Sequence, residues 1–220
     1  YKLNNIIKEL LGDDYYFAPL KKLISLVKGS LIKGNDVQSI NQLIDKYNIN
    51  FGSDREEVIG IKAIPAILTL CKTQTHHIDF DDMIWMPLVN LYPLPQYDVL
   101  FVDEAQDFNE SQRVLISKCV NGGRCIIVGD ENQAIYGFRG ADSQSIDMFR
   151  QRLETGTRKI SEFPLSISWR CPNAVVKEAN RYDKSLQAAD NAIDGSVVVD
   201  APFFPQKGDI VLCRYNAPLI

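Results

Sequence analysis

Two short polar clusters, each directly after a run of apolar residues, are the best candidates for chemistry in this chain of 220 residues. Asp103 and Glu104 follow the run Val99–Val102, and Gly129 and Asp130 follow the next apolar run. A short carboxylate at a strand end suits a hard cation such as Mg²⁺, which prefers oxygen ligands and keeps much of its water. A second carboxylate beside it can orient or deprotonate a water molecule. The pair could therefore serve metal-assisted nucleotide hydrolysis, with Asp103 on the metal and Glu104 as the base.

The second cluster decides between this chemistry and a simpler interpretation. An Asp-Glu pair after an apolar strand is more often a solvated strand end than a catalytic site. The stretch VGDENQAIYGFRGAD, at positions 128–142, adds an uncharged amide, two aromatic rings and an arginine within a few residues. A plain turn has no need of that combination. We expect Gln106 and Asp107 to link the first cluster to the second.

Elements of an α/β fold are expected to position these clusters. Strands at 97–102, 124–128 and 158–168 alternate with helices at 109–120, 143–154 and 173–187, and further strands are expected at 196–200 and 209–213. Such alternation predicts a parallel sheet covered by helices, whose ligands bind at the carboxyl ends of its strands. The helix at 109 is well marked, because Asn109 and Gln112 have the spacing of a capping box.

The first 75 residues contain helical patterns and no strand. Apolar residues at helical spacing predict helices at 3–11, at 18–28, from an N-cap at Asp36, and over 54–72. Asp54 and Glu57 have a capping-box spacing, and Pro65 is expected to kink or divide the last of these helices. Three further acids are expected to cap and charge a helix start: Asp79, Asp81 and Asp82.

Composition bounds the class of protein. A hydrophobic content of 45% can supply a substantial core, and a formal charge of −4 gives no general excess of cations for nucleic acid. The five cysteines are scattered singly, which favours reduced thiols and a cytoplasmic, non-secreted protein. No apolar run approaches the ~18 residues of a membrane span.

The motifs resemble a known family. DEAQD at 103–107, followed about 25 residues later by GDENQAIYGFRGA, is similar to motifs II and III of the UvrD/Rep family of superfamily I DNA helicases. IDFDDMI at 78–84 resembles the segment before motif II, PLSISWRCPNAVVKEAN at 164–180 resembles motif IV, and GDIVLCRYNAPLI at 208–220 resembles the next strand of that family.

The resemblance implies roles for particular residues at an ATP site. Asp103 and Glu104 are expected to be the residues at the Mg²⁺ ion, and Glu104 is also expected to activate the attacking water. Gln133 matches the motif III glutamine that senses the γ-phosphate, and Arg170 matches the motif IV arginine that reaches it across a cleft between two motor domains. Gly129 and Asp130, which open motif III, are expected to line the same nucleotide site.

Three residues later in motif III match positions that face single-stranded DNA. Tyr136 and Phe138 could each stack on a base, which is worth ~1–3 kcal/mol and tolerates any sequence. Both could instead be core aromatics. Arg139 could contact DNA or pair with an acid of the DEAQD segment.

The resemblance implies a RecA-like P-loop NTPase motor with an N-terminal helical segment. We expect residues 1–75 to end a helical insertion, 76–164 to belong to the first motor domain and 165–220 to begin the second. The parent protein would use ATP and Mg²⁺ to move on single-stranded DNA and to unwind duplex junctions. The chain lacks the loop G-x-x-x-x-G-K-[ST] that cradles phosphates, so these residues alone should not hydrolyse ATP. The alternatives are an inactive helicase-like binding module and the motor part of a helicase-nuclease.

Overall fold

The computed structural model describes residues 2–12, 17–120, 122–134, 144–154, 159–200, 204 and 206–212. Tyr136, Phe138 and Arg139 lie outside these ranges. The chain forms two compact units, residues 1–160 and residues 161–220. The described ranges contain many helices and two small parallel sheets, which makes the fold mixed α/β. None of the helices in the described ranges is long and apolar enough to cross a membrane.

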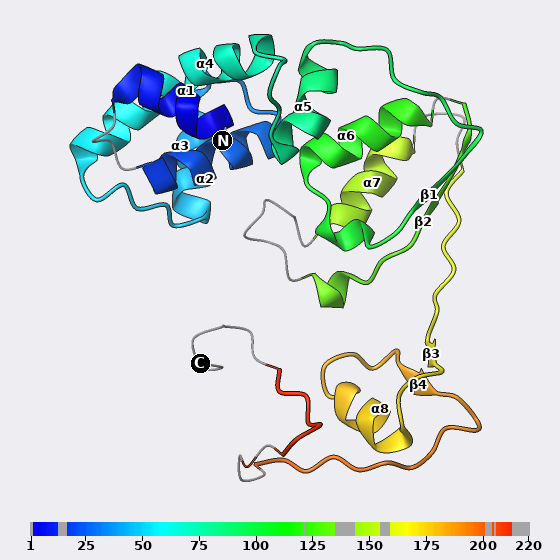
Figure 1. Ribbon diagram of the computed structural model, residues 1–220. Coiled ribbons are helices and arrows are strands. Elements are labelled where there is room, and N and C mark those ends of the chain that lie inside the picture. The colour runs from blue at the N-terminus through cyan, green and yellow to red at the C-terminus, as the bar shows by residue number, and fades with distance from the viewer. Residues whose placement is uncertain are drawn as a thin grey trace. The chain divides into compact units, whose positions relative to one another are not determined.

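Among the described residues, five helices form the first part of the larger unit (Figure 1). They are α1 (Lys2–Leu11), α2 (Phe17–Gly29), α3 (Val37–Lys46), α4 (Asp54–Thr73) and α5 (Phe80–Val89). Each presents an apolar stripe, and these stripes meet in one core that includes Ile7, Ile24, Ile40, Ile64 and Trp85. Burial of such side chains contributes roughly 1.5–3 kcal/mol each. The helices expected in the first 75 residues are therefore confirmed.

The N-caps of α3 and α4 test the helix starts that were predicted from the sequence. Asp36 caps α3 by accepting a hydrogen bond from the Ser39 backbone N–H, as expected. The cap of α4 is Ser53, which accepts from the Glu56 N–H, so the predicted capping box at Asp54 is wrong by one residue. Serine and aspartate are both good N-caps, and here the serine has the extended backbone that a cap requires.

Proline does not divide α4. The helix is assigned without interruption from Asp54 to Thr73, with Pro65 inside it. The Thr69 hydroxyl donates to the Pro65 carbonyl at 2.8 Å and the Thr73 hydroxyl donates to the Thr69 carbonyl at 3.0 Å. Of the two predicted effects of Pro65, division of the helix is wrong, because packing of Ile64, Ile67 and Leu68 in the core holds both halves together, and a kink stays a prediction.

Two parallel strands carry the first polar cluster. Strand β1 (Val99–Val102) pairs with β2 (Arg124–Ile127), with Val99 opposite Arg124 and Val102 opposite Ile127. Helix α6 (Glu110–Cys119) connects the strands and begins with the expected capping box of Asn109 and Gln112. Helix α7 (Ser145–Leu153) follows later in the chain and packs on α6. The predicted order of strand, helix and strand over residues 97–128 is confirmed, and so is the parallel pairing of the two strands.

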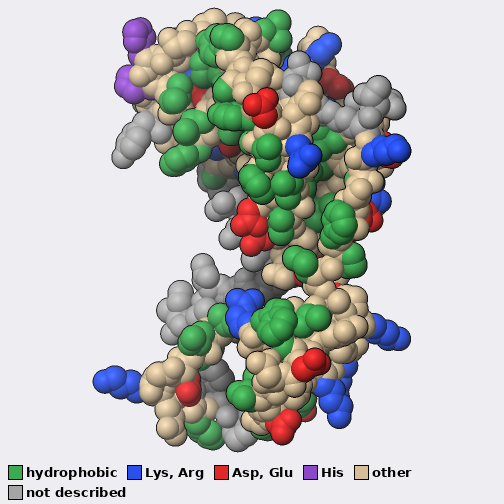
Figure 2. Space-filling model, turned by 90° about the vertical axis from the view of Figure 1, so that its right-hand side faces the viewer, with side chains coloured by type: hydrophobic (Ala, Val, Ile, Leu, Met, Phe, Trp, Pro, Cys, Tyr) green, Lys and Arg blue, Asp and Glu red, His purple; other side chains and the backbone are tan. Residues whose placement is uncertain are grey.

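The two faces of this strand pair differ. Leu100, Val102, Cys125 and Ile127 face a core that α6 and α7 complete with residues such as Phe149. The alternate residues Val99, Phe101 and Ile126 are exposed, and the Phe101 side chain is 73% exposed. Hydrophobic side chains are visible over this side of the larger unit (Figure 2). One face of the sheet is therefore packed and the other is an open apolar surface.

The smaller unit has less regular structure than its sequence pattern predicted. Strand β3 (Ile167–Ser168) pairs in parallel with β4 (Gln187–Ala188), and helix α8 (Asn173–Ala179) lies between them in the chain. The helix predicted at 173–187 ends at Ala179, since the chain must turn for the Gln187 N–H to reach the Ser166 carbonyl, 2.7 Å away.

The other strands predicted for this unit are corrected as well. Within the described residues, the strand expected at 158–168 is reduced to two residues, and 196–200 and 209–212 are not strands. Their apolar side chains are exposed, for example Val198 at 73% and Leu212 at 89%. A strand forms only when a neighbour takes its backbone hydrogen bonds, and these segments pair with no other described segment.

Candidate active site

The ends of β1 and β2 bring the two polar clusters side by side. The Val128 N–H donates to the Val102 carbonyl at 2.8 Å, and the Ala105 N–H donates to the Val128 carbonyl at 3.0 Å. These bonds extend the strand pairing past the last strand residues. As a result, Asp103 and Glu104 follow one strand at the edge where Gly129 and Asp130 follow the other.

Glu104 stands at a sharp backbone turn. Its φ and ψ are 52° and 43°, in the left-handed region, and the turn leads into a short 3-10 helix, Ala105–Asp107. The Asp103 Oδ1 atom accepts a hydrogen bond from the Glu104 N–H at 3.0 Å. Left-handed backbone costs a residue with a Cβ roughly 1–2 kcal/mol, so the surrounding contacts must hold it. Both carboxylates remain exposed to solvent.

Gln106 joins the two clusters through its side chain. Its Nε2 atom donates to Glu104 Oε2 at 2.6 Å, and its Oε1 atom accepts from the Asp130 N–H at 3.0 Å. The residue is 2% exposed, so both ends of its amide are satisfied inside the protein. The predicted link is confirmed for Gln106. For Asp107, the Oδ1 atom is buried and has no hydrogen-bond partner among the residues that the structure describes.

Gly129 makes room for this link. A Cβ atom at position 129 would lie 2.5 Å from Gln106 Oε1, 3.1 Å from the Ala105 nitrogen and 3.1 Å from Ile146 Cδ1. A separation of 2.5 Å from the oxygen is far inside van der Waals contact. The glycine is therefore required by the close approach of the Gln106 amide to the start of the second loop.

The second loop is ordered by its own first acid. Asp130 caps a 3-10 helix, Glu131–Gln133, by accepting from the Asn132 N–H at 3.0 Å. Its other carboxylate oxygen accepts from Gln133 Nε2 at 2.6 Å. The exposed Gln133 amide is thus positioned by Asp130, and the chain Glu104, Gln106, Asp130, Gln133 is connected by consecutive hydrogen bonds.

A buried hydroxyl fixes the turn after Glu104. The Ser145 Oγ atom, at the start of α7, lies 2.7 Å from the Ala105 carbonyl and 3.1 Å from the Phe108 carbonyl. Arg113 of α6 donates to the Phe108 carbonyl at 2.6 Å and to Ser145 Oγ at 3.1 Å. Ser145 and Arg113 are 0% and 3% exposed. Neither residue was predicted from the sequence, although Arg113 lies three residues after Glu110, a helical spacing that brings the two into an ion pair.

The donor set fits a cation that keeps most of its water. The described residues contain no group of three or more histidine, cysteine or acidic side chains that could hold a metal by themselves. Asp103 and Glu104 offer exposed carboxylate oxygens, and Mg²⁺ is usually held by one or two carboxylates together with substrate phosphates. The residues present therefore fit Mg²⁺ bound together with a nucleotide.

The remaining candidate arginine belongs to the smaller unit. Arg170 follows β3 and is exposed to solvent. It lies in residues 161–220, while Asp103, Glu104 and Gln133 lie in residues 1–160. The structure thus brings together the first three and leaves the approach of Arg170 to them as a prediction.

The acidic segment before β1 has a structural role that the sequence only partly revealed. Asp79 and Asp82 form a capping box at the start of α5, as expected. The Asp82 carboxylate also binds two buried lysines, Lys2 Nζ and Lys28 Nζ, each at 2.8 Å. Lys28 reaches Asp79 at 3.0 Å and lies 5.6 Å from the centre of the Trp85 ring. This lysine cluster ties α1, α2 and α5 together.

Charge pairing outweighs burial in the lysine cluster. Burial alone would raise the pKa of Asp82, but hydrogen bonds from Lys2 and Lys28 hold that pKa below its ordinary value. Burial alone would lower the pKa of Lys28, but the Cys71 thiol and the Asp82 and Asp79 carboxylates raise it above the ordinary value. Asp82 and Lys28 are therefore both charged at neutral pH.

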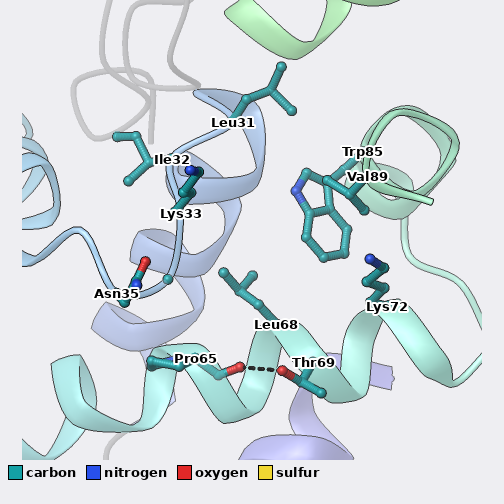
Figure 3. A pocket seen from close by; sticks show the side chains of 11 residues that line it. Leu31, Ile32, Lys33, Asn35, Pro65, Leu68, Thr69, Lys72, Trp85 and Val89 are labelled. Atoms are coloured by element: carbon teal, nitrogen blue, oxygen red, sulfur yellow. Dashed lines mark hydrogen bonds between the residues drawn. The ribbon is translucent and has the colours of Figure 1, made fainter. Parts of the chain in front are cut away.

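The helical part also contains a shallow pocket of about 480 Å³ (Figure 3). It is lined by the loop after α2, by Pro65, Leu68 and Lys72 of α4 and by Trp85 of α5. The Leu68 side chain points into it, and Lys72 lies on the Trp85 side. None of the candidate residues at the ends of β1 and β2 lines this pocket.

The fold and the site define a class: α/β proteins whose polar site lies at the carboxyl ends of parallel strands. Comparison with known proteins then gives the family. The description "UvrD/REP helicase N-terminal domain" matches residues 7–154, more than half of the chain. The chain belongs to the UvrD/Rep helicase family.

Individual relatives cover smaller parts. F-box DNA helicase protein 1 of Schizosaccharomyces pombe is 39% identical over 100 residues, which is 44% of this chain and 11% of that protein. ATP-dependent DNA helicase PcrA of Staphylococcus epidermidis is 38% identical over 84 residues, 34% of this chain and 11% of that protein. The PcrA protein of Staphylococcus aureus is 31% identical over 118 residues, 49% of this chain and 16% of its own length. The chain therefore corresponds to a small part of these relatives.

Proposed function

We propose that this chain is part of an ATP-dependent DNA helicase that couples ATP hydrolysis to movement on single-stranded DNA. The observation that carries the proposal is the connected site at the ends of β1 and β2 in a chain of the UvrD/Rep family. Relatives named as DNA helicases support the same activity. The substrate would be ATP with Mg²⁺, and the track would be single-stranded DNA next to duplex junctions.

In the proposed reaction, the Glu104 carboxylate accepts a proton from water as the water oxygen bonds to the γ-phosphorus of ATP. The bond from that phosphorus to the bridging oxygen breaks, and ADP leaves. Asp103 would hold Mg²⁺, which when bound offsets negative charge on the phosphates. Gln133 can bond a phosphate oxygen or the attacking water, and Gly129 and Asp130 shape the loop that presents it.

Arg170 is proposed to reach the γ-phosphate when the two motor domains close. An arginine in this role contributes ~10³–10⁵ in rate. Tyr136, Phe138 and Arg139 are proposed to contact single-stranded DNA, because aromatic stacking tolerates any base.

We further propose that residues 76–164 belong to a RecA-like motor domain, after the end of a helical insertion at 1–75, and that 165–220 begin a second motor domain. The exposed apolar face of β1 and β2 supports this proposal, because parallel sheets are covered on both faces. Another part of the parent protein would cover that face and supply the phosphate-binding loop. The compact unit that starts at Ser161 supports a second motor domain.

The test is DNA-stimulated ATP hydrolysis by the full-length protein and its Glu104→Gln variant. Loss of a general base lowers the rate by about 10²–10⁴, so the turnover number should fall by that amount while ATP still binds. Glu131→Gln is the matched control, because Glu131 is exposed and is not proposed to touch the nucleotide, whereas Glu110 forms ion pairs with Arg113 and Arg152. Undiminished turnover in Glu104→Gln would refute the assignment of the base.

The same assay separates the alternatives. An inactive binding module would bind single-stranded DNA without hydrolysing ATP. A helicase-nuclease would hydrolyse ATP and also cut DNA, with the cutting unaffected by Glu104→Gln in the absence of ATP.

A further inference from the structure

We propose that Gln106 is a positioning residue that sets the orientation of Glu104 and couples it to the loop that carries Gln133. The inference rests on the proposed function and adds to it a residue that touches neither ATP nor water. Its basis is one buried amide that serves both loops, with Nε2 on the Glu104 carboxylate and Oε1 on the Asp130 N–H.

Burial makes this amide a rigid connector. Gln106 is 2% exposed, and the residue before it, Ala105, is 0% exposed. The Ala105 carbonyl is held by Ser145, and the Ala105 N–H is held by Val128. The backbone on which Gln106 stands is therefore fixed by contacts to α7 and to the neighbouring strand.

The two ends of the Gln106 amide cannot be exchanged, because one is a hydrogen-bond donor and the other an acceptor. A neutral amide donates only through nitrogen and accepts only through oxygen, so one orientation satisfies both partners. Rotation of the amide by 180° would place its oxygen against the Glu104 carboxylate and its NH₂ group against the Asp130 N–H. A shift of the second loop that moves the Asp130 N–H must therefore pull on Gln106, and through it on the Glu104 carboxylate.

The short path from Gln106 to Gln133 completes the coupling. Asp130 donates its N–H to Gln106 and accepts from Gln133 through its carboxylate. When Gln133 moves toward a γ-phosphate, the loop moves with Asp130. The orientation of the base then depends on whether the nucleotide carries that phosphate, so hydrolysis is favoured only when the sensor loop is engaged.

The decisive variant is Gln106→Glu in the full-length protein. A glutamate keeps the shape and the acceptor for the Asp130 N–H but replaces the donor to Glu104 with a like charge. We expect the turnover number for DNA-stimulated ATP hydrolysis to fall about 10- to 100-fold, the range typical of a partner that orients a functional ligand. The KM for ATP should stay within about twofold of wild type, because Gln106 is not proposed to touch the nucleotide.

The pH profile separates positioning from a purely structural role. A carboxylate next to Glu104 raises the pKa of the pair, so the acid limb of the rate profile should move to higher pH. Gln106→Met, which removes both hydrogen bonds without adding charge, should lower turnover with a smaller shift of that limb. Gln151→Glu is the matched control, because Gln151 is exposed on α7 and the change in charge is the same.

Gly129 provides an independent approach. Gly129→Ala places a methyl group 2.5 Å from Gln106 Oε1 and should displace the amide, with a loss of turnover similar to that of Gln106→Met. If the two changes act through one contact, the double variant should lose little more than either single variant. Thermal unfolding and ADP binding, measured on every variant, show that the proteins are folded and bind nucleotide.

The outcomes are distinct. Wild-type protein that shows no DNA-stimulated ATP hydrolysis refutes the proposed function and this inference with it. Active wild-type protein with a Gln106→Glu variant that matches Gln151→Glu in turnover and pH profile overturns the role of Gln106 alone. A Gln106→Glu variant that loses thermal stability without a shift of the acid limb assigns a structural role and also overturns it.

Discussion

Replacement of Asp82 by asparagine should cost this chain a large part of its stability. The Asp82 side chain is 0% exposed, and each carboxylate oxygen binds a lysine Nζ atom at 2.8 Å. An asparagine would offer one acceptor oxygen and no charge, so Lys28, itself 0% exposed, would keep only Asp79. Removal of one partner from a buried ion pair typically costs about 3–5 kcal/mol. We expect the free energy of unfolding to fall by about that amount.

Urea unfolding monitored by tryptophan fluorescence can measure this change. Trp85 is 5% exposed and lies beside Lys28, whereas the only other tryptophan, Trp169, is 79% exposed. A Trp169→Phe background therefore leaves one reporter next to the lysine cluster. Asp79→Asn is the matched comparison, because it keeps an N-cap and loses a carboxylate that is 23% exposed. Its cost should be about 1 kcal/mol.

The pH dependence gives a second measurement on the same proteins. Because the folded pKa of Asp82 is lowered, its contribution is fully present above the unfolded value of about 4 and is lost as pH falls through the folded pKa. The raised pKa of Lys28 has the opposite sign, so its contribution is present below about pH 10 and is lost at higher pH. A change below 1 kcal/mol for Asp82→Asn at pH 7, or one equal to that of Asp79→Asn, would refute the reasoning.

Two other changes test the scaffold. Ser145→Ala removes a fully buried hydroxyl that bonds two carbonyls and Arg113, so the free energy of unfolding should fall by about 1–3 kcal/mol in urea titrations, while the exposed Ser161→Ala should be neutral. Burial raises the pKa of the Cys71 thiol, so iodoacetamide at pH 8 should modify Cys71 far more slowly than the partly exposed Cys171, as peptide mass spectrometry would show. Equal rates at the two thiols would contradict the burial of Cys71.

Helix caps could be predicted from the sequence, because the two residues that form a cap lie close together in the chain. Asp36 caps α3 by accepting from the Ser39 N–H, and Asn109 forms a capping box with Gln112. In both cases a spacing of three residues is enough to bring the groups together. The parallel pairing of β1 and β2 followed from two apolar runs separated by one helix. The link through Gln106 was also expected, since it joins two loops that the sheet must place at one edge.

The lysine cluster could not be predicted in the same way. Lys2 and Lys28 lie 80 and 54 residues from Asp82 along the chain, and a lysine in an amphipathic helix normally faces solvent. The prediction of strands in the smaller unit was wrong for a related reason. Apolar runs around Val198 and Leu212 have the composition of strands, but strand formation depends on a neighbour that composition does not reveal.

At position 104, the left-handed backbone favours glycine for stability, whereas the proposed activity requires glutamate. Glycine adopts that conformation without steric cost, so Glu104→Gly would release roughly 1 kcal/mol of strain while removing the proposed base. Selection for thermal stability alone would therefore favour loss of the carboxylate. In a laboratory library screened only for folded protein, position 104 would drift toward glycine or asparagine, and recovery of glutamate there would require a selection for ATP turnover.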